Sequence, residues 1–140
     1  MKQDYDVLIV GGGLAGNCLA LALQGSDLNI AIVEASTREQ LHTSPAGDRA
    51  LALASGTIHM LEALGIWPAA KALATPIKTI HVSDQGHFGK TRLSAKKEGV
   101  AALGYVITAR DLEDVVSQLV AQADIEQICP ARVIGIASDD

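Results

Sequence analysis

The chain has 140 residues, of which 49% are hydrophobic and only 3% aromatic, and its formal net charge at pH 7 is −5. These values predict one domain with an aliphatic core. The negative charge gives no reason to expect nucleic acid as a partner, and no apolar run approaches the roughly 18 residues that a membrane span needs. We therefore expect a soluble, cytoplasmic protein.

A glycine loop near the N-terminus follows an apolar strand. Val7–Val10 show no alternation, which is typical of a strand covered on both faces in a parallel sheet. Gly11, Gly13 and Gly16 fit the pattern G-x-G-x-x-G, whose glycines allow a tight turn, a close approach to a pyrophosphate and close packing of helix on strand. The helix start also offers unpaired N–H groups to an anion. The predicted diphosphate site comprises Gly11, Gly13, Leu14, Ala15 and Gly16.

An acidic residue ends the second predicted strand. Apolar residues recur at helical spacing over 14–23, and Gly25 is placed to end that helix. The apolar run Ile30–Val33 then stops at Glu34, about 20 residues past the glycines, where a dinucleotide-binding fold places the acid that binds the adenosine ribose. Because a 2′-phosphate would meet this anion, the sequence favours FAD or NAD over NADP. The alternative is a chance acid after an ordinary glycine turn.

An arginine follows the polar stretch that leaves this unit. Residues 35–47 predict a surface loop that has room for a short helical turn. Arg49 lies just before the apolar run Ala50–Ala54. Because a guanidinium matches a diphosphate in geometry and charge, we expect Arg49 to contact the cofactor, with a merely solvated charge as the alternative.

The middle of the chain predicts two short helices and an antiparallel β-ribbon. Ser55 or Thr57 can cap the first helix, and residues 67–74 form the second. Alternation over 77–84 and a returning strand at 90–93 predict a ribbon with one wet face.

Histidines and cysteines give no case for a metal. His87 lies in the ribbon's turn, where it is either solvated or close to a ligand. The four histidines lack carboxylates or cysteines at ligand spacing. Cys18 and Cys129 show no C-x-x-C pattern, so we expect them to be buried free thiols. No nucleophile motif is present either, so catalytic residues stay unknown.

The last long helix carries the clearest pattern in the sequence. Its apolar stripe consists of Leu112, Val115, Val116, Leu119, Val120 and Ala123. Thr108 and Asp111 resemble a capping box with a shortened acid. Arg110 stands in the first turn, where the helix dipole disfavours a cation, so it is either solvated or compensated by a nearby anion. Residues 125–129 and 131–136 are two further strand candidates.

Several of these motifs stand together in a recognisable order. They are Gly-Gly-Gly-Leu-Ala-Gly at 11–16, Glu34, Asp-Arg-Ala-Leu-Ala-Leu at 48–53, Val-Ser-Asp-Gln-Gly-His-Phe-Gly at 82–89, Ala-Leu-Gly-Tyr-Val at 102–106 and Cys-Pro-Ala-Arg-Val at 129–133. In this order the chain resembles the N-terminal third of the aromatic-ring hydroxylases of ubiquinone biosynthesis. The aspartate-arginine element and the ribbon make the resemblance more specific than the glycine motif alone.

The resemblance implies a Rossmann-like α/β FAD-binding fold, with a βαβ start, a parallel sheet and an antiparallel β-ribbon. It implies a flavin-dependent monooxygenase, in which FAD reduced by NAD(P)H reacts with dioxygen to give a C4a-hydroperoxide that hydroxylates a polyprenyl phenol. By resemblance, the glycines would hold the pyrophosphate, Glu34 the ribose, Arg49 the flavin nucleotide, Arg110 the pyrophosphate and Val133 the adenine, and His87 would lie toward the flavin ring and substrate. No side chain is an obvious acid or base, which suits chemistry that belongs to the cofactor.

Length is where the chain departs from this family. Its members run to several hundred residues and carry a second FAD motif further along. We therefore expect residues 1–140 to be a truncated, N-terminal part of the FAD-binding domain that is inactive alone. The alternatives are half of an NAD-dependent dehydrogenase, which would continue with alternating helices and parallel strands, and a noncatalytic dinucleotide-binding module. Association with the periphery of the inner membrane or with a biosynthetic complex stays open.

Overall fold

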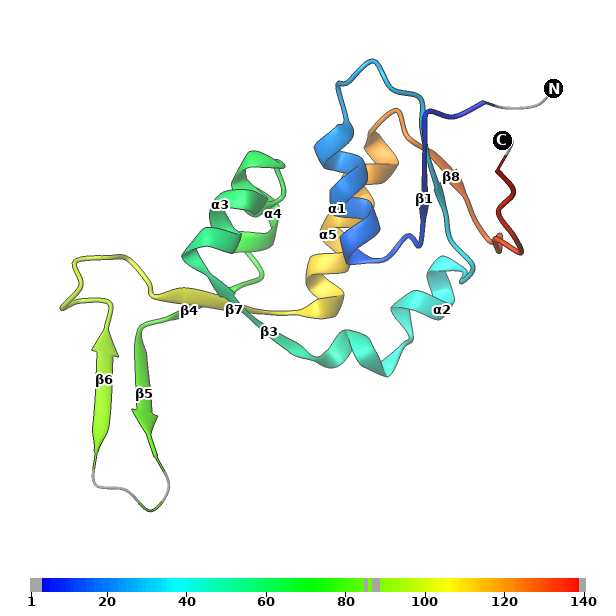
Figure 1. Ribbon diagram of the computed structural model, residues 1–140. Helices are drawn as coiled ribbons and strands as arrows, with labels where there is room; N and C mark the ends of the chain where they lie inside the picture. Colours follow the sequence, from blue (N-terminus) through cyan, green and yellow to red (C-terminus); the bar gives the residue numbers. More distant parts are fainter. Residues whose placement is uncertain (1–3, 85, 87–88, 139–140) are drawn as a thin grey trace.

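The computed structural model describes residues 4–84, 86 and 89–138 and has the α/β architecture predicted from the sequence (Figure 1). The strands are β1 (Val7–Val10), β2 (Ile30–Val33), β3 (Ala50–Ala54), β4 (Thr75–Ile77), β5 (Thr79–Ser83), β6 (Lys90–Ser94), β7 (Gly104–Thr108) and β8 (Glu126–Ile128). The helices are α1 (Leu14–Leu23), α2 (Arg38–His42), α3 (Ser55–Ala63), α4 (Trp67–Lys71) and α5 (Ala109–Gln122), with a short 3-10 turn η1 (Pro45–Asp48).

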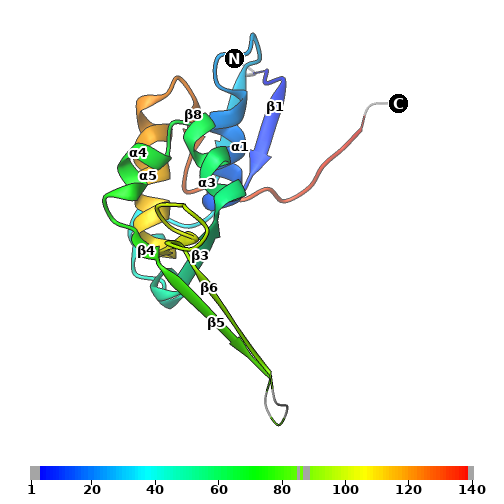
Figure 2. The same ribbon diagram turned by 90° about the vertical axis from the view of Figure 1, so that its left-hand side faces the viewer.

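Within the described part of the chain, the strands form two small sheets and a separate ribbon. β1, β2 and β8 make a parallel sheet with β2 in the centre. β3, β7 and β4 make an antiparallel sheet with β7 in the centre. β5 and β6 pair as an antiparallel ribbon, with Ile80 opposite Leu93, and this ribbon extends away from the helices (Figures 1 and 2). The parallel βαβ start followed by antiparallel strands confirms the Rossmann-like fold class.

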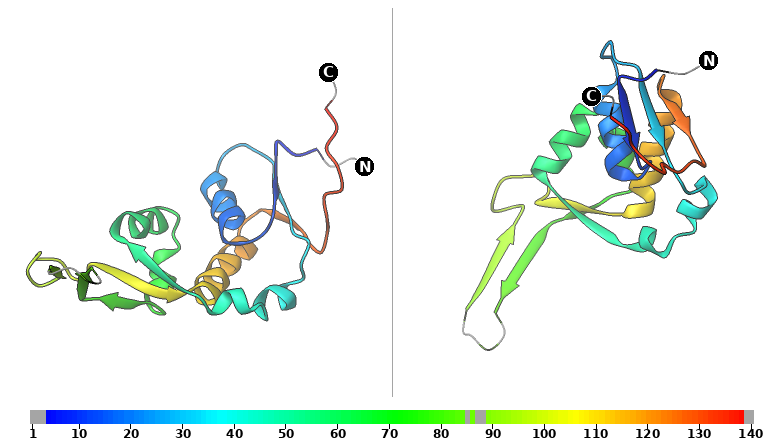
Figure 3. Two further views of the ribbon diagram at one scale, coloured as in Figure 1. Left: turned by 60° about the horizontal axis from the view of Figure 1, so that its bottom comes forward. Right: turned by 45° about the vertical axis from the view of Figure 1, so that its right-hand side comes forward.

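The core lies where α1 and α5 pack side by side between the parallel sheet and the α3–α4 pair (Figures 1 and 3). It is aliphatic, as the composition predicts, and its largest fully buried side chains are Ile32, Ile66, Ile107, Val116 and Val120. The predicted stripe of α5 faces this core: Leu112, Val115, Val116 and Val120 are buried, and Leu119 and Ala123 are packed against it. Among the described residues, no helix combines the length and apolarity needed to cross a membrane.

Side chains cap the N-termini of α5 and α2, and the sequence predicts the first of these caps. The Asp111 N–H donates to Thr108 Oγ1 over 3.1 Å, so Thr108 caps α5 as predicted. The Asp111 carboxylate accepts from the Thr108 hydroxyl over 2.6 Å, in place of the backbone N–H of a full capping box. Thr37 and Gln40 form a complete capping box at α2, within the stretch predicted to be a surface loop with room for a short helical turn.

The prediction of a side-chain cap for α3 is wrong. β3 ends at Ala54 and α3 begins at Ser55, so the strand runs directly into the helix. Ala54 therefore occupies the N-cap position and no side chain caps the helix. Ser55 and Thr57 lie inside the first turn instead, where a hydroxyl cannot play the capping role.

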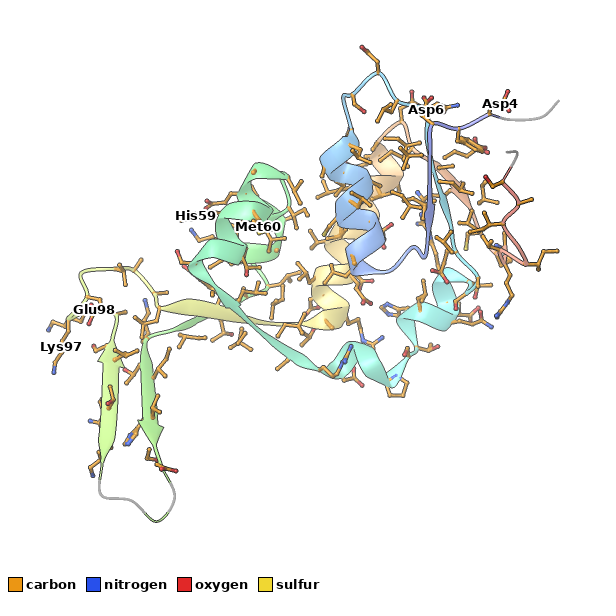
Figure 4. All side chains as sticks on the ribbon, viewed as in Figure 1. Asp4, Asp6, His59, Met60, Lys97 and Glu98 are labelled. Atoms are coloured by element: carbon orange, nitrogen blue, oxygen red, sulfur yellow. The ribbon has the colours of Figure 1, made fainter. Side chains whose placement is uncertain are left out.

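Predictions of burial fail where no neighbouring element covers a strand. Leu8 and Val10 of β1 are 48% and 63% exposed, so β1 is covered on one face only, whereas β2 is buried along its whole length. Val82 is also exposed, so the β5–β6 ribbon is wet on both faces. Figure 4 places Lys97 and Glu98 in the loop after this ribbon, far from α1 and β1.

The second predicted C-terminal strand, residues 131–136, is absent. Figure 2 shows this segment running away from the helices, and Ile134 and Ile136 are 97% and 93% exposed. Apolar residues alone do not make a strand, because a strand also needs a neighbour for its backbone hydrogen bonds.

The burial predicted for the two cysteines is found only in part. Cys129, just before this segment, is exposed, so only Cys18 approaches the burial expected of a free thiol.

Candidate nucleotide-binding site

The glycines at the start of α1 differ in what surrounds them. Gly11 has φ +106°, which favours glycine. A Cβ on Gly16 would overlap the Gly11 carbonyl oxygen and lie 3.2 Å from Ile9, so Gly16 permits the close packing of α1 on β1. A Cβ on Gly13 would meet nothing within 4 Å, so the space beside Gly13 is open. The turn at Gly11, the open space at Gly13 and the close packing at Gly16 therefore lie where the motif predicts them. Contact of this loop with a diphosphate stays a prediction.

The start of α1 has the properties of an anion site. Gly13 is the N-cap, and the first hydrogen bond of the helix runs from the Asn17 N–H to the Gly13 carbonyl over 3.0 Å. The preceding N–H groups of the first turn therefore lack partners within the helix. Asn17 was not predicted from the sequence, although its side chain is buried and its Nδ2 donates to the Gly12 carbonyl over 2.7 Å. This bond links the first turn of α1 to the glycine loop.

Glu34 connects the end of β2 to the glycine loop. Its Oε2 accepts from the Gly12 N–H and its Oε1 from the Ser36 N–H, both over 2.7 Å. A Cβ on Gly12 would lie 3.0 Å from the Glu34 Cβ, which explains a glycine at this position of the motif. Each carboxylate oxygen keeps a second acceptor direction, so binding of a ribose hydroxyl remains a prediction for Glu34.

These bonds make the stability contributed by Glu34 depend on pH. The Ser36 N–H lowers the pKa of Glu34 below its ordinary value, the Gly12 N–H acts in the same direction, and burial opposes both. Because the folded-state pKa is the lower one, the contribution is present above the unfolded pKa of about 4.3 and is lost as the pH falls through the folded pKa.

We expect Glu34→Gln to reduce the acid sensitivity of the fold. Between about pH 5 and pH 3 the free energy of unfolding of Glu34→Gln should fall less than that of the unmodified chain, because the amide does not titrate. Denaturant unfolding across this range measures the difference. Glu62→Gln, on the exposed side of α3, is the matched control and should keep the original pH dependence. Equal acid sensitivity of Glu34→Gln and the unmodified chain would contradict this role of Glu34.

A cleft of about 440 Å³ opens beside the glycine loop, between α2 and α5. This volume lies within the range of small-molecule sites. The loop and α1 contribute Gly12, Gly13 and Asn17; α2 contributes Arg38, Glu39, Leu41 and His42; α5 contributes Arg110, Glu113, Asp114, Ser117 and Gln118. The residues from α5 recur at helical spacing opposite its apolar stripe, so the period of the helix already indicates this polar face in the sequence.

Arg110 lines this cleft and has an anionic partner. Its Nη2 donates to Asp48 Oδ1 over 2.7 Å and to the Ser44 carbonyl over 3.2 Å. The hydrogen bond with Asp48 raises the pKa of Arg110, because it favours the charged guanidinium. Of the two alternatives left open by the sequence, the structure therefore supports a compensating anion at the start of α5, and this anion is Asp48.

Two further predicted site residues, Arg49 and Val133, do not line the cleft. Arg49 is exposed just before β3, and its carbonyl accepts from the Ala109 N–H over 2.8 Å. Val133 is half-buried in the segment after β8, and His87 lies outside the described residues. The cofactor contacts assigned to Arg49 and Val133 by resemblance stay predictions. Among the described residues, no group of three His, Cys, Asp or Glu side chains is placed to hold a metal ion.

Known proteins resemble this chain in both sequence and structure. A family model described as an FAD binding domain matches residues 4–129. An uncharacterized protein of Synechocystis sp. is 36% identical over 120 residues, with 83% of this chain and 28% of that protein covered. Ubiquinone hydroxylase UbiL of Rhodospirillum rubrum is 29% identical over 140 residues, with 96% of this chain and 31% of that protein covered. The resemblance to hydroxylases of ubiquinone biosynthesis is confirmed.

A solved structure gives the same picture of the fold. The crystal structure of PqsL, a probable FAD-dependent monooxygenase from Pseudomonas aeruginosa, has a TM-score of 0.76 at 20% identity, covering 97% of this chain and 35% of PqsL. The chain spans less than a third of the length of the two curated relatives described above. Since the family match includes the glycine loop, Glu34 and both walls of the cleft, the chain belongs to the FAD binding domain family.

Proposed function

We propose that residues 1–140 are the N-terminal part of the FAD-binding domain of a flavin-dependent monooxygenase that hydroxylates a polyprenylated phenol in ubiquinone biosynthesis. The observation that carries the proposal is the open space at Gly13 beside a cleft, within the residues that match an FAD binding domain. The name of the relative UbiL supports the ubiquinone pathway. Within the hydroxylases, the motifs resemble most those of 2-octaprenyl-6-methoxyphenol hydroxylase.

The described residues fit the adenosine diphosphate half of FAD. The first-turn N–H groups of α1 and the guanidinium of Arg110 would hold the diphosphate, because both offer donors to an anion beside the same cleft. Glu34 would accept from the ribose. When bound, FAD supplies the oxygen chemistry, with NAD(P)H as transient reductant. The part of this chain is to bind and orient the cofactor, while catalytic residues stay unassigned.

The alternative of a dehydrogenase half is less well supported. Such a half would continue after β2 with alternating helices and parallel strands. Instead, β3, β7 and β4 form an antiparallel sheet, and β5 and β6 form an antiparallel ribbon. A noncatalytic dinucleotide-binding module accounts for the cleft as well, so a test of the reaction is needed.

The reaction can be tested on a longer chain that begins with these 140 residues and reaches the length of the curated relatives. We expect a prenylated phenol to stimulate its NAD(P)H oxidation, and labelled dioxygen to deliver one oxygen atom to the ring, because a monooxygenase divides dioxygen between product and water. Mass spectrometry of the product measures this. Labelled water serves as the control and should leave the product unlabelled. Label arriving from water, or oxidation that the phenol does not stimulate, would contradict the proposal.

A further inference from the structure

We infer that Asp48 is a positioning residue for the diphosphate site: together with the Ser44 carbonyl and Gly47, it fixes Nη2 of Arg110 and leaves the remaining guanidinium N–H groups for an anion in the cleft. The inference rests on the proposed function, because it assumes that a nucleotide diphosphate binds beside Gly13. The inference concerns η1. Neither the glycine motif nor the resemblance gives this segment a role in positioning Arg110.

The hydrogen bonds described for Arg110 lie on one side of its guanidinium. Both hydrogen bonds described for this group use Nη2, with Asp48 Oδ1 at 2.7 Å and the Ser44 carbonyl at 3.2 Å. The Arg110 side chain is 24% exposed and that of Asp48 is 74% exposed. Asp48 therefore binds Arg110 from the solvent side. A guanidinium has five donors in a rigid fork, so fixing one nitrogen also orients Nε and Nη1.

Gly47 provides the surface on which the guanidinium rests. Gly47 is buried, and a Cβ there would lie 3.1 Å from Arg110 Cζ and 3.2 Å from Nη2. Its backbone N–H donates to the Ser44 carbonyl over 3.0 Å, the same oxygen that accepts from Arg110. The backbone of the turn at residues 44–48 thus contacts one side of the guanidinium, and the Asp48 carboxylate binds the guanidinium from the solvent side.

The position of Arg110 in the helix explains why its positive charge needs the Asp48 carboxylate nearby. A cation in the first turn of a helix is disfavoured by the helix dipole. The Asp48 carboxylate compensates the guanidinium at hydrogen-bond distance, while Asp114 and Glu113 act on it through space. An arginine that is already ordered loses less side-chain freedom when an anion binds, so its contribution to affinity is larger. Asp48 also repels a diphosphate, and the sign of its effect on affinity decides between positioning and competition.

The test compares the binding of ADP and adenosine to the 140-residue chain by ligand-observed NMR. We expect Asp48→Ala to weaken ADP binding up to about tenfold, because the Arg110 side chain would then have to be ordered when the diphosphate binds, and to leave adenosine binding unchanged. In an Arg110→Gln background, Asp48→Ala should cause no further loss, because Asp48 acts through Arg110. Asp48→Asn removes the charge but keeps an acceptor oxygen, so its affinity for ADP should lie between those of the unmodified chain and Asp48→Ala. Asp124→Ala, an exposed acid after α5, is the charge-matched control and should behave as the unmodified chain.

Each result decides between defined outcomes. Unchanged ADP binding by Asp48→Ala would overturn the positioning role, and tighter binding would overturn it and show that Asp48 competes with the diphosphate for Arg110. Equal weakening of ADP and adenosine, or the same loss with and without Arg110, would overturn it in favour of a general effect on the fold. If the unmodified chain bound neither ligand, the assignment of the cleft beside Gly13 as a diphosphate site would fail, and this inference would fail with it, whereas the proposed hydroxylation is decided separately by the labelled-dioxygen experiment on the longer chain. If Asp48→Ala did not fold, Asp48→Asn would carry the same comparison.

Discussion

Valine at Gly16 should destabilise the fold strongly, whereas valine at Gly13 should leave the fold intact and abolish nucleotide binding. At Gly16 the new side chain would overlap the Gly11 carbonyl oxygen, which belongs to the backbone and cannot move aside without displacing the loop. Overpacking of this kind costs about 1–3 kcal/mol or more, a large share of the roughly 5–15 kcal/mol that stabilises a domain.

The same substitution at Gly13 has a different target. Gly13 has φ −76° and ψ −172°, an extended conformation that valine adopts readily, and no atom lies within 4 Å of its ideal Cβ. The valine would instead fill the space that we assign to the diphosphate. Denaturant unfolding and ADP binding separate the two effects, since each variant serves as the control for the other. A Gly16→Val protein as stable as the unmodified chain would contradict the packing role, and a Gly13→Val protein that binds ADP normally would contradict the assignment of the loop.

Local elements of this fold could be predicted because their signals are local. The bounds of α1 coincide with the apolar spacing over 14–23, and the stripe of α5 is buried as its period predicts. Gly16 packs closely and Glu34 meets the glycine loop, which follows from the fixed spacing of the motif. In each case the residues that determine the conformation are neighbours in sequence or belong to one strand-loop-helix unit.

Burial and long-range pairing could not be predicted in the same way. The open face of β1 and the wet ribbon at Val82 depend on which other elements pack there, and an apolar pattern does not contain that information. The pairing of Asp48 with Arg110 spans 62 positions, so no spacing rule indicates it. From the sequence, an anion near Arg110 was only one of two alternatives. The polar face of α5, by contrast, was readable from its period.

The 140-residue chain alone should purify without flavin and should self-associate. Its glycine loop and Arg110 offer donors for the diphosphate, but the second FAD motif implied by the resemblance, which would contact the flavin half, is not among these residues. The loss of several hydrogen bonds at about 1 kcal/mol each, together with buried ring contacts, lowers the affinity by several powers of ten. In addition, β1 is an edge strand whose outer face exposes Leu8 and Val10, and Ile134 and Ile136 are almost fully exposed. Exposed strand edges and clustered apolar side chains favour association.

Gel filtration with an in-line absorbance spectrum tests both parts of this prediction, because bound flavin absorbs visible light and bound NAD does not. Val10→Lys should shift the chain toward the monomer, since it places a charge on the open face of β1. Met60→Lys is the matched control: Met60 on α3 is as exposed as Val10, at 67% against 63%, but lies away from β1 (Figure 4), so this variant should associate like the unmodified chain. Equal effects of the two lysines would place the contact elsewhere than on β1. A stable monomer that carries one flavin per chain would mean that these residues already form a complete site, and the interpretation of the chain as part of a larger FAD-binding domain would have to be abandoned.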